Sequence, residues 1–75
     1  MRIQVRYFAM LREHRGTDRD ELHLADGATA ADAYAASGCP AGLRVGYAVN
    51  EAFVGPDTVL ADGDEVAFLP PLGGG

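Results

Sequence analysis

The sequence predicts an α+β domain, in which a mixed sheet of about four to five strands carries one main helix on one of its faces. Two observations lead to this class. Short segments in which large apolar residues alternate with polar ones recur along the chain, as in strands with one buried face. One alanine-rich segment begins at Thr29, a good helix-capping residue, and ends at Gly38, a helix stop. A length of 75 residues fits a single domain.

The first part of the chain is expected to form two strands joined by a helical turn. Residues 2–7 alternate between apolar and polar side chains and predict the first strand. Residues 8–13 predict a short helical turn that Gly16 caps. A polar turn over residues 17–20 then leads into a second short strand over residues 21–24.

The main helix is expected to begin at Thr29, whose hydroxyl can accept a hydrogen bond from the backbone N–H of Asp32. Asp32 would also lie in the first turn, where the helix dipole favours an acid. Tyr34 is the only large apolar side chain of this helix. Tertiary contacts must therefore supply most of its stability.

The second part of the chain is expected to form three more strands. Residues 43–49 alternate and predict a strand that ends in a tight turn at residues 50–51. Residues 52–54 form a short return strand. Residues 58–60 resemble a single helical turn, and residues 65–69 predict the last strand.

This order of elements is the β-grasp arrangement of ubiquitin-like domains. We assign residues 1–69 to the β-grasp domain and residues 70–75 to a flexible, extended tail. Pro70 and Pro71 hold the exit extended, and three terminal glycines follow without side chains. Six extended residues reach about 20 Å. Such an end can enter a narrow tunnel in a partner and present its α-carboxylate there.

Composition and charge exclude several functions. Eleven acidic and six basic residues give a net charge of −5, which argues against a nucleic-acid partner. The basic residues are all arginines, so the chain has no lysine for a Schiff base. A single cysteine, Cys39, excludes an internal disulfide and a multi-cysteine zinc site. We expect a cytoplasmic protein without a signal peptide or membrane contact, because no apolar run approaches the roughly 20 residues of a membrane span.

Three segments resemble the ubiquitin-like sulfur carriers of the MoaD/ThiS type, and most closely the small subunits of molybdopterin synthases. They cover residues 5–13 (VRYFAMLRE), 48–51 (AVNE) and 60–75 (LADGDEVAFLPPLGGG). The last is the most specific, because it joins Gly-Asp-Glu-Val to Pro-Pro and a terminal Gly-Gly. Gly73 stands where relatives often carry serine, alanine or threonine, and residues 33–43 match less well.

The resemblance implies a sulfur carrier, which is no enzyme on its own but the sulfur-donating small subunit of a heteromeric enzyme. An E1-like partner would use ATP to adenylate Gly75, which follows Gly74. A sulfur donor such as a persulfide protein would then convert Gly75 into a thiocarboxylate. The carrier would dock on the molybdopterin synthase large subunit and donate sulfur to a cyclic pyranopterin precursor in molybdenum cofactor biosynthesis. The chain itself would bind no cofactor and no metal. The expected partner-binding residues are Leu69, Pro70, Pro71, Leu72 and Gly73.

Two other functions stay open on the sequence alone. The chain could carry sulfur to another acceptor, in thiamine or cysteine synthesis or in tRNA thiolation. Thiamine-pathway carriers typically begin with an asparagine-glycine hairpin and lack the Pro-Pro exit, so they resemble the chain less. The chain could also be a β-grasp module that binds a partner noncovalently, with an incidental tail.

The last strand is expected to divide its side chains between two faces. Val66 and Phe68 would face the helix, whereas Leu69 would lie on the open face beside the tail. Together with Leu72, Leu69 would form a docking patch for the partner.

The remaining polar residues point to weaker hypotheses. An acidic group is expected near the tail exit, where it could steer encounter with a basic partner; it comprises Asp57, Asp62, Asp64 and Glu65. Cys39 lacks a neighbouring base, and the spacing of His14 and His23 matches no metal motif. Arg2 and Arg6 are expected to be surface charges.

Overall fold

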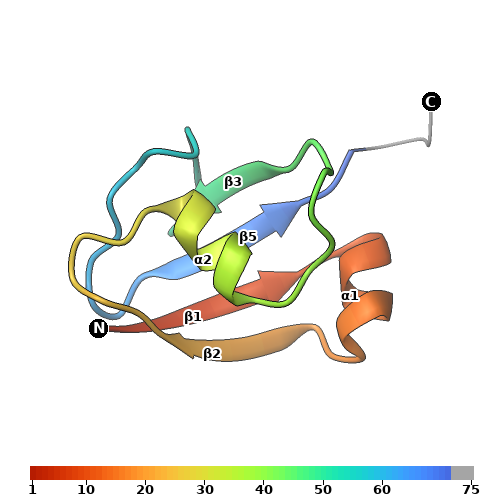
Figure 1. Cartoon of the computed structure of the whole chain (residues 1–75), viewed down its shortest axis with the longest axis horizontal. Coiled ribbons are helices and arrows are strands. Elements are labelled where there is room, and N and C mark those ends of the chain that lie inside the picture. The colour runs from red at the N-terminus through yellow and green to blue at the C-terminus, as the bar shows by residue number, and fades with distance from the viewer. Residues whose placement is uncertain (72–75) are drawn as a thin grey trace.

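In the computed structural model, which describes residues 1–71, the chain forms one five-stranded mixed sheet with two helices (Figure 1). The strand order is β2-β1-β5-β3-β4, and only the central pair, β1 and β5, is parallel. This confirms the expected α+β, β-grasp arrangement. The elements are β1 (Arg2–Tyr7), α1 (Ala9–Arg15), β2 (Arg19–His23), α2 (Ala30–Ala36), β3 (Gly46–Val49), β4 (Ala52–Val54) and β5 (Glu65–Leu69).

The core lies between α2 and one face of the sheet, the covered face. Every second residue of the central strands points into it, and these residues are almost completely buried: Ile3, Val5, Tyr7, Val66 and Phe68. Tyr34 of α2 packs edge-on against Phe68, with ring centroids 5.2 Å apart. The predicted inward positions of Val66 and Phe68 are confirmed.

Both helices begin or end at the residues that the sequence indicates. Thr29 Oγ1 accepts from the Asp32 backbone N–H, and Asp32 Oδ2 accepts from the Thr29 N–H, which is a complete capping box. Gly38 follows α2 with a φ of 81°, and Gly16 caps α1 with a φ of 74°. Glycine is favoured at both sites because a left-handed backbone strains other residues.

One expected element and two expected strand starts are wrong. Residues 58–60 form no helical turn; they run extended beside the start of α2, where Val59 makes a β-bridge to Thr29. The Ala30 N–H donates to Thr58 O, and the Leu60 N–H donates to Ala28 O. These long-range bonds satisfy the backbone better than one isolated turn would. In addition, β3 begins at Gly46 rather than at residue 43, and β2 begins at Arg19, inside the expected turn.

The predicted tight turn between β3 and β4 is confirmed. Asn50 and Glu51 both have positive φ, 49° and 72°. Two consecutive left-handed residues match the twist of an antiparallel hairpin. The Asn50 side chain further ties this turn to β5, because its Oδ1 accepts from the Glu65 N–H at 3.0 Å.

Candidate docking face and tail exit

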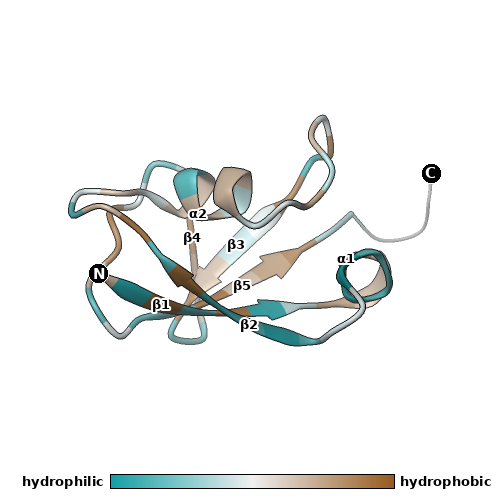
Figure 2. Cartoon of the chain, turned by 60° about the horizontal axis from the view of Figure 1, so that its bottom comes forward, coloured by the Kyte–Doolittle hydropathy of each residue, from teal (hydrophilic) through white to brown (hydrophobic). Residues whose placement is uncertain are grey.

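The face of the sheet opposite α2, called the open face below, is crossed by neither helix (Figure 2). α2 lies on the other side of the sheet, and α1 packs at the end where β1 finishes. Strand pairing brings outward residues together here: Leu69 pairs with Gly46, Ala67 with Ala48, and Ala48 with Phe53. The open face over β5, β3 and β4 is therefore apolar, except at Glu65, which begins β5.

An open hollow of about 430 Å³ lies at the tail end of this face. Its walls come from three separated parts of the chain: the β1–α1 junction, β4 and the exit from β5. The lining residues are Phe8, Ala9, Phe53, Leu69 and Pro70. We call it the apolar hollow. All five side chains lack a polar group, so the hollow suits an apolar side chain of a partner.

Phe53 is the most unusual residue of the apolar hollow. Its side chain is 84% exposed, although phenylalanine normally contributes to stability by burial. Single exposed apolar residues are ordinary on protein surfaces. Phe53, however, shares the hollow with Leu69 and Pro70, and clustered exposed apolar groups mark interaction sites.

The structure brings together two of the predicted partner-binding residues. Leu69 lies half-buried on the open face, as expected, and Pro70 lines the hollow beside it. Pro71 is exposed. The other predicted site residues lie outside the described residues: Leu72, Gly73, Gly74 and Gly75. The tail therefore leaves the domain at the rim of the apolar hollow.

Sequence reasoning missed three residues of the hollow: Phe8, Ala9 and Phe53. The sequence pattern predicts a helical turn at Phe8, but this residue is extended and precedes α1, while Ala9 has a φ of 49°. This sharp change of direction brings the β1–α1 junction against the end of β5. The exposed position of Phe53 is hard to predict from the sequence, because a strand of three residues does not reveal which face of the sheet each side chain lies on.

The acidic group does not lie at the tail exit. Glu65 begins β5 and pairs with Gln4, whereas the tail leaves after Leu69 at the other end of that strand. Asp62 accepts from the Arg2 backbone N–H at 2.7 Å, and Asp64 accepts from the Ala61 N–H at 2.8 Å. These carboxylates stabilise loops at the far end of the sheet, so the predicted position beside the tail is wrong.

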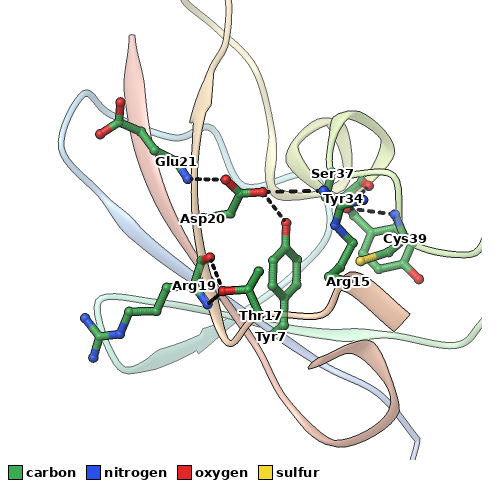
Figure 3. Close-up of polar contacts among 9 residues, drawn as sticks. All are labelled: Tyr7, Arg15, Thr17, Arg19, Asp20, Glu21, Tyr34, Ser37 and Cys39. Atoms are coloured by element: carbon green, nitrogen blue, oxygen red, sulfur yellow. Dashed lines mark hydrogen bonds and ion pairs between the residues drawn. The ribbon is translucent and has the colours of Figure 1, made fainter. Parts of the chain in front are cut away.

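A polar cluster joins α1 to β1 and β2 (Figure 3). The buried Tyr7 hydroxyl donates to Asp20 Oδ2 at 3.3 Å, and Arg15 Nη2 lies 3.6 Å from the same oxygen. Burial, and then the Asp20 charge, raise the pKa of Tyr7. Because these polar groups contact one another, the cluster stabilises the packing of α1 against β2.

Cys39 and the two histidines belong to no metal-binding group within residues 1–71. The Cys39 backbone N–H donates to Ser37 Oγ, and its thiol is free and half-buried. His23 Nε2 lies 3.0 Å from Glu21 Oε2, while His14 is exposed on α1. In the described part of the chain, no three acidic, histidine or cysteine side chains gather around a possible metal position. Nor does either helix have the length and apolarity needed to cross a bilayer.

Comparison with known proteins links this geometry to one family. Residues 5–75 match the model of the ThiS family. The molybdopterin synthase sulfur carrier subunit of Chlamydomonas reinhardtii is 41% identical over 83 residues, which cover 100% of this chain and 100% of the relative.

Two solved structures are similar to the chain. Small archaeal modifier protein 1 of Haloferax volcanii superposes with a TM-score of 0.80 over 95% of this chain and 98% of that one; at 21% identity it shows the fold alone. A chain in the complex of subunits 1 and 2 of the molybdopterin-converting factor from Helicobacter pylori is similar as well. The match has a TM-score of 0.64 at 25% identity and covers 100% of both chains.

Proposed function

The chain belongs to the ThiS family, and from this premise we propose that it is the sulfur carrier subunit of a molybdopterin synthase. The observation that carries the proposal is the position of the tail, which leaves β5 at the rim of an apolar hollow on the open face. A partner that fills the hollow would hold the base of the tail in place. The full-length similarity to a molybdopterin synthase sulfur carrier supports the choice of pathway.

Docking on the synthase large subunit is the first step of this proposal. Phe53 and Leu69 supply apolar surface, and Pro70 restricts the direction of the chain that follows. Binding there would lower the entropy of the tail and raise the local concentration of its end within the partner. The H. pylori complex of subunits 1 and 2 is consistent with such an assembly.

Activation of Gly75 is the second step. An E1-like partner would transfer AMP from ATP to the Gly75 carboxylate, with release of pyrophosphate, which converts a poor electrophile into a good one. The terminal sulfur of a persulfide protein would then displace AMP to give an acyl disulfide, and a thiol would cleave this disulfide to leave the Gly75 thiocarboxylate and a disulfide on the donor. We place the ATP site and the sulfur-transfer groups on the partners. The absence of lysine from the chain agrees with this division of roles.

Mass spectrometry of the tryptic peptide after Arg44 tests the chemistry. The chain is incubated with an E1-like enzyme, ATP and a sulfur donor before digestion. Residues 45–75 contain neither cysteine nor methionine, so exchange of oxygen for sulfur cannot be confused with side-chain oxidation of sulfur. We expect the exchange to map to Gly75. A chain that lacks Gly74 and Gly75 is the matched control and should stay unmodified.

A noncovalent interaction module is the second candidate, because the apolar hollow could bind a partner without the tail. Deletion of Gly74 and Gly75 separates the two functions. The carrier would lose sulfur transfer and keep its fold, whereas the module would keep its activity. A carrier for another sulfur acceptor would be distinguished by which large subunit co-purifies with the chain.

A further inference from the structure

Two arginines face each other on the open face, next to the apolar hollow. Arg6 of β1 and Arg19 of β2 are direct cross-strand partners. The Arg6 guanidinium carbon lies 5.1 Å from the centroid of the Phe8 ring, which lines the hollow. Arg19 extends its guanidinium away from the Tyr7–Asp20 cluster (Figure 3). The chain therefore places two positive charges at the border of its apolar docking surface.

Neither arginine forms an ion pair with a carboxylate within residues 1–71. The ion pairs of the described residues leave out both Arg6 and Arg19. The Arg6 Nε–H is buried and finds no hydrogen-bond acceptor among them. A buried donor without an acceptor and like charges on opposed residues both lower stability. Arg6 was expected to be a simple surface charge, but it is half-buried.

The other end of the same two strands is balanced. Glu21 of β2 accepts from Gln4 Nε2 at 3.0 Å and lies 3.0 Å from His23 Nε2 and 3.9 Å from Arg2 Nε. These contacts hold the pKa of Glu21 below its usual range, the Gln4 hydrogen bond first. The contrast shows that the same two strands can neutralise their charges. The charges that are not neutralised, on Arg6 and Arg19, lie beside the apolar hollow.

We propose that Arg6 and Arg19 together bind a carboxylate of the synthase large subunit, beside the apolar group that enters the hollow. This inference rests on the proposed function. The chain carries a net charge of −5, so the two arginines form a local positive site in an acidic protein. Such a site helps to fix the orientation in which a partner docks. The Phe8 ring supports the Arg6 guanidinium and leaves its terminal N–H groups for a carboxylate.

Binding of the unactivated chain to the large subunit tests the proposal, since it requires no sulfur chemistry. We compare the wild-type chain with Arg6→Gln, Arg19→Gln and the double variant by isothermal titration. We expect the double variant to raise Kd about tenfold or more, as for the loss of a charged hydrogen bond, and to reduce its salt dependence. Arg2→Gln is the matched control, on the same strand and face but already paired with Glu21. It should leave Kd within about twofold of the wild-type value.

A thermal unfolding series distinguishes binding from folding. Arg6→Met keeps an apolar side chain of similar length and removes the buried Nε–H donor that has no acceptor. We therefore expect an equal or higher Tm together with weaker binding to the large subunit. If the double variant binds as tightly as Arg2→Gln, the inference is overturned and the proposed function stands. If the wild-type chain does not bind the large subunit at all, both are overturned. If Arg6→Met unfolds at a clearly lower temperature, Arg6 has a structural role and the inference fails.

Discussion

The local sequence pattern does not explain why Phe53 is exposed in the apolar hollow. Its exposure follows from pairing with Ala48, whose neighbours on β3 face the core. The sequence of β4, Ala-Phe-Val, is equally compatible with a buried phenylalanine. Leu69, in contrast, could be placed from the alternation of β5, because five residues define two faces unambiguously. The side chains that form the apolar hollow are thus only partly predictable.

Phe53→Ala should separate binding from stability. Because the side chain is 84% exposed, we expect the free energy of unfolding in urea to change by less than about 0.5 kcal/mol. Binding to the large subunit should weaken about tenfold, as for an aromatic anchor residue. Val59→Ala is a suitable control, because Val59 is 63% exposed but lies beside the start of α2. Equal affinities of the two variants would contradict the role of the hollow in docking.

At the scale of elements, the ends of α2 are determined by neighbouring residues, whereas its position depends on tertiary packing. Its seven residues are too few for independent stability, so the helix depends on its caps and on packing of Ala30, Ala33 and Tyr34. Thr29, Asp32 and Gly38 were recognisable in the sequence. The extended segment beside its start was not, because its hydrogen bonds join residues that are about thirty positions apart.

Thr29→Ala should destabilise the domain through the cap of α2. The variant loses the acceptor for the Asp32 N–H, and we expect a cost of about 1 kcal/mol, or a Tm lower by about 5 °C. Differential scanning calorimetry provides the measurement. Thr29→Ser retains the hydroxyl and should lose much less. The same loss in both variants would show that the methyl group, and not the cap, is responsible.

At the scale of the whole molecule, the core is built around an aromatic cluster. Rings from β1, α2, β3 and β5 meet in it: Tyr7, Tyr34, Tyr47 and Phe68. Burial is the main cause that raises the pKa of each of the three tyrosines above its ordinary value. The Tyr34 hydroxyl also donates to Pro40 O at 2.6 Å, which ties α2 to the loop that follows it.

The tyrosines make the fold sensitive to alkali. Their pKa values are about 10 in the unfolded chain and higher in the folded one, so their contribution to stability is complete below pH 10. It is lost as the pH rises through the folded values. We therefore expect tyrosinate absorbance and loss of far-ultraviolet circular dichroism to appear together above pH 10. Since the chain has no lysine, no lysine side chain titrates in that range. Complete tyrosinate formation near pH 10 in a folded domain would contradict this prediction.

Local sequence patterns were enough to predict the order of the helices and main strands, a cap for each helix, the tight turn at Asn50 and Glu51 and the family. These features depend on neighbouring residues, through alternation, capping and turn chemistry. Three features depend on how distant segments meet in the fold: the apolar hollow, the opposition of Arg6 and Arg19, and the place of Asp62 and its neighbours at the far end of the sheet. These features depend on strand register, because a sheet joins residues that are distant in the chain. The register is determined by packing of the whole core and not by any one segment.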